Sequence, residues 1–269
     1  DLHSFPTRRS SDLVLTLAAT WTLPGTAAGA ETISADRLTK YLTKAMRESK
    51  LHTSWTSPDE DYESAVIEFA TACLTTPEVG AALEAFTELT FPSVRANILG
   101  QKLIQLTMPG VPDLYQGCEV VDLSLVDPDN RRPVDYYRRS GVLTALDMNP
   151  PADLDAEKLL VTSRALLLRR DHPEAFRGPD AEYRSVSLNT GHAVVFERGY
   201  RDSETPVAIT VATRVQSGLH EEGWGDAELV LPSLRFRDVL TGREYPGGAT
   251  PLADILDRLP VALLVHQVD

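Results

Sequence analysis

The pattern of the chain changes at Gly178. Before this residue, apolar side chains recur at helical spacing, as in 38–46, where they fall at i, i+3, i+4, i+7 and i+8. After it, short segments rich in Val, Ile, Leu and Phe alternate with Gly, Asp and Pro, a pattern typical of antiparallel strands. We expect strands at 193–198, 206–213, 228–231, 234–240 and 261–268. The sequence therefore predicts a helical region followed by a small antiparallel β-sandwich.

Capping residues and prolines predict where the helices begin and end. In Ser57-Pro58-Asp59-Glu60, Ser57 can cap a helix and Glu60 can close a capping box. Thr76-Pro77 begins a helix that reaches about Leu89, and a separate helix from 94 to 106 ends before Pro109-Gly110. Further helices are expected after Pro133 and over 155–170.

One short apolar run, 111–117, lies between glycines and is too short for a helix. Because helices flank it, it predicts a single buried strand of an α/β layer. Pro112 is compatible with the first positions of a strand.

The first residues have two interpretations. Residues 1–13 resemble a translated sequencing adapter, which would make them a non-native segment. Alternatively, Arg8-Arg9, the apolar stretch 13–23 and Ala28-Gly29-Ala30 form a signal peptide with its cleavage site, and the chain is a secreted helical–β protein.

Charge and cysteine content exclude several classes of protein. The formal net charge is −13, which argues against nucleic acid and anionic membranes as partners. The two cysteines, Cys73 and Cys118, cannot form a disulfide framework or a zinc site and indicate reduced thiols in the cytoplasm. There is no run of about 20 apolar residues, so no segment is expected to span a membrane. The residues present imply no metal or organic cofactor.

Two polar clusters could bind a ligand. Tyr115, Gln116 and Glu119 follow the expected strand, and an Asp-, Asn- and Arg-rich loop, 127–133, comes soon after. Carboxylate, amide and guanidinium groups together suit a sugar, whose hydroxyls both donate and accept hydrogen bonds. The alternative is that Asp129 and Arg131 pair with each other and cap the following helix.

The second cluster is His52, Ser54 and Trp55. An exposed indole can stack on a sugar ring, although a Trp also packs well against a helix.

Long motifs in this chain resemble a known family. The string GVPDLYQGCE at 110–119 is similar to the last barrel strand of the α-amylase superfamily of glycoside hydrolases. Its continuation, DLSLVDPDNRRPVDY, resembles the maltooligosyltrehalose synthases within that superfamily. HTSW at 52–55, LRRDHP at 168–173 and DVLTGR at 238–243 resemble further segments of the family in the same order.

The resemblance implies a fold and an activity. Residues 14–177 would be the C-terminal part of a (β/α)8 barrel with inserted helices, and 178–269 a C-terminal β domain. The implied reaction converts the reducing-end α-1,4 bond of a maltooligosaccharide into an α,α-1,1 bond with retention of configuration. Retaining enzymes need two carboxyl groups about 5 Å apart. In this superfamily those groups lie on earlier barrel strands, so we expect no catalytic residue here and an inactive chain.

By the same resemblance, the chain contributes residues that line or support the substrate cleft: Tyr115, Gln116, Glu119, Asp129, Asn130, Arg131, His52, Ser54 and Trp55. Independent catalysis by Asp127 and Asp129 is disfavoured, because no apolar pocket would raise one pKa. The alternative function is a non-catalytic glucan-binding protein. Without neighbours for the strand at 111–117, we expect 14–177 to aggregate and 178–269 to fold alone.

Overall fold

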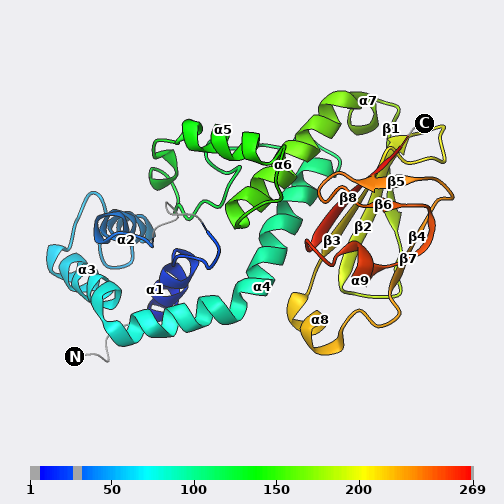
Figure 1. Ribbon diagram of the computed structural model, residues 1–269. Helices are drawn as coiled ribbons and strands as arrows, with labels where there is room; N and C mark the ends of the chain where they lie inside the picture. The colour runs from blue at the N-terminus through cyan, green and yellow to red at the C-terminus, as the bar shows by residue number, and fades with distance from the viewer. Residues whose placement is uncertain (1–6, 27–31, 268–269) are drawn as a thin grey trace. The chain divides into compact units, whose positions relative to one another are not determined.

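The computed structural model describes residues 7–26 and 32–267. Contacts divide the chain into two compact units, which we call the first unit (Asp1–Phe91 and Asp122–Val134) and the second unit (Pro92–Val121 and Asp135–Asp269) (Figure 1). The expected cleavage site at Ala28-Gly29-Ala30 lies outside the described residues, as do the first six residues of the segment interpreted as non-native. The described end of that segment, from Thr7, forms the start of helix α1.

The first unit is helical. It contains α1 (Thr7–Ala19), α2 (Ala35–Ser49), α3 (Glu60–Thr75), the start of α4 (Pro77–Thr107) and a short 3-10 helix, η1 (Asp129–Arg131). Helix α2 confirms the predicted amphipathic helix: Ser34 caps it by accepting a hydrogen bond from the Arg37 N–H, and its apolar face is buried. The buried core of this unit consists of Leu13, Leu17, Ile33, Leu38, Ala70 and Leu83.

Two predicted helix boundaries are wrong. The N-cap of α3 is Asp59 rather than Ser57, because the Asp59 carboxylate accepts the N–H of Tyr62 at 3.0 Å. The expected break between 89 and 94 is absent, and α4 continues through Pro92. A proline removes one intrahelical hydrogen bond but has a helical φ, and buried residues at helical spacing follow it, such as Ala96, Leu99 and Leu103.

The second unit contains two antiparallel sheets. The larger has the strand order β1-β2-β3-β8-β5-β6, and the smaller pairs β4 with β7. Their bounds are β1 Ala181–Val186, β2 Ala193–Tyr200, β3 Ala208–Thr213, β4 Glu228–Leu231, β5 Phe236–Asp238, β6 Glu244–Tyr245, β7 Gly248–Pro251 and β8 Val261–His266. The five predicted strands are confirmed, with β3, β5 and β8 shorter and β2 longer than expected.

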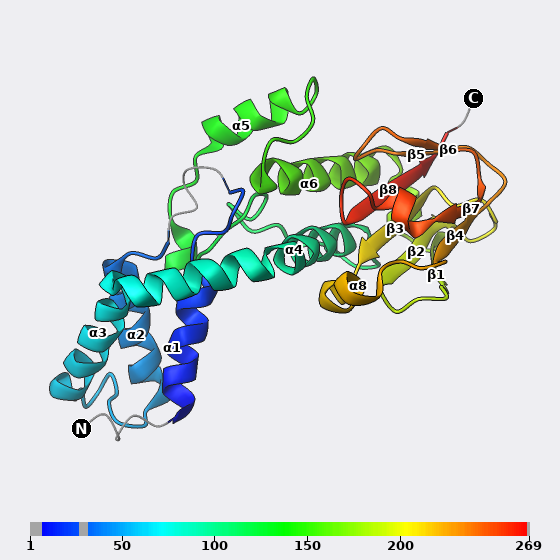
Figure 2. The same cartoon turned by 60° about the horizontal axis from the view of Figure 1, so that its bottom comes forward.

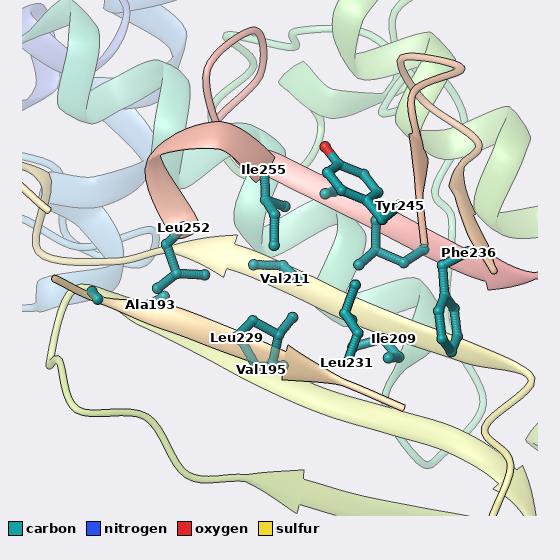
Figure 3. Close-up of a cluster of buried hydrophobic side chains, with 13 residues drawn as sticks. Ala193, Val195, Ile209, Val211, Leu229, Leu231, Phe236, Tyr245, Leu252 and Ile255 are labelled. Atoms are coloured by element: carbon teal, nitrogen blue, oxygen red, sulfur yellow. The ribbon is translucent and has the colours of Figure 1, made fainter. Parts of the chain in front are cut away.

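A hydrophobic core lies between the two sheets. Val195 and Val211 from the large sheet, and Leu229 and Leu231 from β4, are all nearly inaccessible to solvent. Figure 3 shows Leu252 and Ile255 of the short helix α9 (Leu252–Ile255) directed toward the large sheet. This part of the chain is sandwich-like, with a second layer of only two strands.

Helices cover the opposite face of the large sheet. The end of α4 and helix α6 (Leu154–Asp171) lie on the side away from β4 and β7 in both views (Figures 1 and 2). Thr210 of β3 donates a buried hydrogen bond to Thr107 of α4 at 2.9 Å. All six residues of β3 are buried, so the sheet has no wet face along this strand.

The predicted strand at 111–117 is wrong for this chain, and a barrel fragment is not confirmed. Every strand pair in the described residues is antiparallel, and 111–115 has no regular secondary structure. A parallel strand requires neighbours that complete its backbone hydrogen bonds, and no strand flanks this segment in the described part of the chain. Side chains hold it instead: Gln105 donates to the Asp113 carbonyl at 2.7 Å and Arg169 to the Gly110 carbonyl at 3.3 Å.

No single helix within 7–26 and 32–267 is long and apolar enough to cross a membrane; only α3 and α4, taken together as a broken pair, meet the criteria of length and composition.

Candidate functional site

The first unit holds an exposed tryptophan next to a rigid ion pair. Trp55 lies in the loop between α2 and α3 and is 57% exposed. The guanidinium carbon of Arg47 lies 5.0 Å from the centre of the indole. This cation–π contact holds the ring against the end of α2.

Arg47 is itself fixed by Glu63 of α3. Its Nε and Nη2 donate to the two Glu63 oxygens at 2.9 and 2.7 Å. The Thr53 hydroxyl donates to the same carboxylate, and the Asp59 N–H donates to that hydroxyl. These hydrogen bonds, led by the one from Arg47, lower the pKa of Glu63 to about 2. The carboxylate therefore stays ionised and keeps Arg47 beneath Trp55.

The other two predicted residues of this loop shape it. Ser54 accepts the Ser57 N–H at its hydroxyl at 3.0 Å, and its own N–H donates to the Ser57 carbonyl at 3.1 Å. The His52 ring packs on Tyr62, with centroids 4.9 Å apart. A tight turn with one flat ring open to solvent is suited to stacking on a sugar.

Asp129 does not pair with Arg131, contrary to one interpretation of the sequence. Its oxygens accept from Arg37 at 2.8 and 2.7 Å, and Oδ2 also accepts the Leu125 N–H at 2.7 Å. The Arg37 hydrogen bonds lower the pKa of Asp129. The following helix, α5 (Tyr136–Ala145), is capped by Asp135 instead. Asp129 thus supports the loop from within.

The other two residues of η1, Asn130 and Arg131, differ in how far their side chains are exposed. Arg131 forms an ion pair with Asp127, and the Arg131 side chain is 67% exposed. The side-chain oxygen of Asn130 is buried and accepts no hydrogen bond within the described residues. The exposed Arg131 guanidinium can donate to hydroxyl groups of a ligand, whereas the buried Asn130 oxygen is closed to solvent.

The remaining three predicted residues belong to the second unit. Tyr115 and Gln116 are exposed in the loop before Gly117. Glu119 is paired with Arg139 of α5 at 3.1 Å, and Arg139 also donates to the Gly117 carbonyl. Within 7–26 and 32–267, the side chains of Tyr115 and Gln116 form no hydrogen bond and point their polar groups to solvent, whereas Glu119 holds the loop in place.

A buried lysine, Lys102 of α4, lies below this loop. Its ammonium donates to Gln105 at 2.8 Å, and burial lowers its pKa. Cys118 and Glu119 oppose this shift through their charge, which places them near the ammonium.

Sequence patterns did not predict a role for Arg37, Arg47, Glu63, Lys102 or Arg139. One signal was available for Glu63: it lies at helical spacing from Ala70 on the buried face of α3, and an acid on an apolar face needs a partner. Among the described residues, no group of three or more His, Cys, Asp or Glu side chains is arranged to hold a metal ion.

The chain is similar in sequence to known proteins. No family model matches the chain. Proteins from two strains of Mycobacterium tuberculosis, named maltooligosyl trehalose synthase, are 39% identical to it over 234 residues. The chain is homologous to the maltooligosyltrehalose synthases. The aligned part is 86% of this chain and 28% of the relatives' length.

Solved structures agree with this relationship. Maltooligosyltrehalose synthase from Arthrobacter ramosus superposes with a TM-score of 0.81 at 38% identity, over 95% of this chain and 32% of that enzyme. A second maltooligosyl trehalose synthase, at 23% identity and a TM-score of 0.64, shares the fold. The chain therefore spans about a third of the length of the synthases it resembles.

Proposed function

We propose that this chain forms part of an enzyme that rearranges maltooligosaccharides. The reaction converts the reducing-end α-1,4 bond into an α,α-1,1 bond and leaves a trehalosyl end. The observation that carries the proposal is the 39% identity to maltooligosyl trehalose synthases over 86% of the chain. The alternative of a non-catalytic glucan-binding protein gains nothing from these relatives.

We assign the chain's own residues to the glucan rather than to bond cleavage. In the first unit, Trp55 offers a ring that can stack on a glucosyl unit and Arg131 an exposed guanidinium for sugar hydroxyls. In the second unit, Tyr115 and Gln116 are exposed and offer further polar groups. The other five predicted site residues have supporting roles within their own units: His52 and Ser54 shape the turn before α3, Asp129 and the buried Asn130 belong to the loop fastened by Arg37, and Glu119 holds the loop of Tyr115.

We infer that the chain is inactive by itself. A retaining mechanism needs a carboxylate nucleophile and a carboxylic acid whose pKa is raised. Asp129 fails the second requirement, because Arg37 lowers its pKa. We also propose that 14–177 completes a (β/α)8 barrel in a longer protein, where flanking strands would pair with 111–117. Cys73 and Cys118 are not joined in a disulfide, which suits a cytoplasmic enzyme.

A chimera tests the proposal. The segment of the Arthrobacter ramosus enzyme that superposes on this chain is replaced by this chain, and the loss of reducing ends from maltopentaose is measured. We expect the folded chimera to rearrange the substrate and the isolated chain to leave it unchanged. A folded chimera without activity, or an isolated chain that makes trehalosyl products, would contradict it.

A further inference from the structure

A wide groove lies in the second unit, and none of the nine predicted site residues lines it. It has a volume of about 980 Å³ and is bounded by the α5–α6 loop, α6 and the turn after β5. Aliphatic side chains line it: Leu160 and Leu168 of α6, Leu240 and Leu259 are buried, and Leu167 and Val239 are half-buried. The groove therefore has an apolar floor.

The carboxylates along the groove are already neutralised. Each has an arginine partner: Asp147 with Arg164, Glu157 with Arg95, and Asp171 with Arg170. None of the three leaves a free negative charge at the floor.

Two arginines on the opposite wall have no such partner. Arg237 and Arg258 line the groove, are exposed, and form no side-chain hydrogen bond or ion pair within the described residues. Glu244 is the cross-strand neighbour of Arg237 but makes no ion pair with it. The two guanidinium groups are therefore able to bind the carboxylates of a partner.

The lining also argues against a sugar. It contains no Phe, Tyr or Trp, so a glucosyl ring would find no aromatic surface for stacking. Aliphatic side chains flanked by free guanidinium groups match an acidic segment of polypeptide that carries aliphatic residues.

We propose that the groove between α6 and the turn after β5 is a docking site for an acidic, aliphatic segment of a partner protein. An aliphatic side chain of the segment packs on Leu167 and Val239, which line the groove and are half-buried. Its carboxylates pair with Arg237 and Arg258.

Labelled peptides test the proposal. One peptide alternates Glu and Leu, and a second carries Lys in place of each Glu; binding to the full chain is followed by fluorescence anisotropy. We expect saturable binding of the acidic peptide only, weakened by added salt. Absence of saturable binding, or equal binding of the basic peptide, would overturn the proposal.

Charge-reversed variants locate the contact. Arg237→Glu with Arg258→Glu should weaken binding of the acidic peptide by about tenfold or more. Arg214→Glu removes an exposed arginine outside the groove and should change it by less than about twofold. If the reversed pair does not fold, Arg237→Gln with Arg258→Gln replaces it. Binding that survives in the folded pair, or competition by maltoheptaose, refutes the assignment.

Discussion

Arg37 and Asp129 lie 92 positions apart and meet in a two-bond ion pair, with Nε–Oδ1 at 2.8 Å and Nη2–Oδ2 at 2.7 Å. Arg37 also donates to the Leu123 carbonyl at 3.0 Å. The pair therefore fastens the polar loop that follows Asp122 to helix α2. Its side chains are only 15% and 12% exposed, so neither group is fully solvated if the other is removed.

Replacing Asp129 with Asn should destabilise the chain by about 2 kcal/mol, because a half-buried guanidinium loses its ionised partner. Urea unfolding followed by circular dichroism measures the change. The matched control is Arg131→Ala, which breaks an exposed pair and should cost less than about 0.5 kcal/mol. Equal effects of the two substitutions would show that Asp129 does not fasten the loop.

Stability should fall in acid through Glu63. Its pKa is about 2 in the folded chain and 4.5 in an ordinary setting, so the ionised form favours folding. The contribution is complete above pH 4.5 and is lost as the pH falls toward 2. The free energy of unfolding, measured across this range, should drop less steeply in Glu63→Gln than in the unmodified chain. Glu68→Gln, at an exposed position of α3, should leave the slope unchanged.

Trp55→Ala should weaken the affinity for maltoheptaose by about fivefold to tenfold, because the stacking surface is lost. Isothermal titration calorimetry on the full chain measures this change. Trp224→Phe, at a partly buried position beside the core of the second unit, serves as the control and should bind normally. Unchanged affinity in Trp55→Ala would remove this residue from the glucan surface.

Residues 178–269 expressed alone should be unstable or self-associating, contrary to the expectation from sequence. Cutting at Gly178 removes the helices that cover the large sheet, leaving Phe196 and Leu263 without cover. It also removes the Ala175 carbonyl, to which the buried Arg198 guanidinium donates at 2.9 Å. Size-exclusion chromatography and thermal melting test this; a monomer with a cooperative transition would contradict it. Residues 92–269 without 122–134, joined by a short linker, are the comparison.

Sequence patterns correctly predicted the elements whose formation depends on residues close together in the chain. The helix α2 follows from its apolar spacing and its serine cap, and β4 was placed at 228–231 because turn residues flank it. The strand expected at 111–117 failed because a strand depends on partners that its own residues do not encode. Its apolar composition is equally compatible with a loop held by Gln105 and Arg169.

In the candidate site, too, residue types could be interpreted from the sequence, whereas contacts with distant residues could not. Trp55 and Tyr115 were predicted because their residue types suit a sugar, and both side chains are exposed. The partner of Asp129 was missed because nothing within a few residues of it indicates Arg37, and the nearby Arg131 offered a simpler pair. Ion pairs between residues far apart in the sequence cannot be predicted from the spacing of residues along the chain.

The buried hydrogen bond between Thr107 and Thr210 bears on how α4 and the large sheet come together. Thr107 donates to the Leu103 carbonyl of its own helix and accepts from Thr210, so each hydroxyl proton has one acceptor. If the helix slid along the sheet by a single residue, the Thr210 hydroxyl would face hydrocarbon without an acceptor. Hydrophobic contacts alone would allow α4 to pack on the sheet in several registers. The hydrogen bond between the two threonine hydroxyls favours one of them.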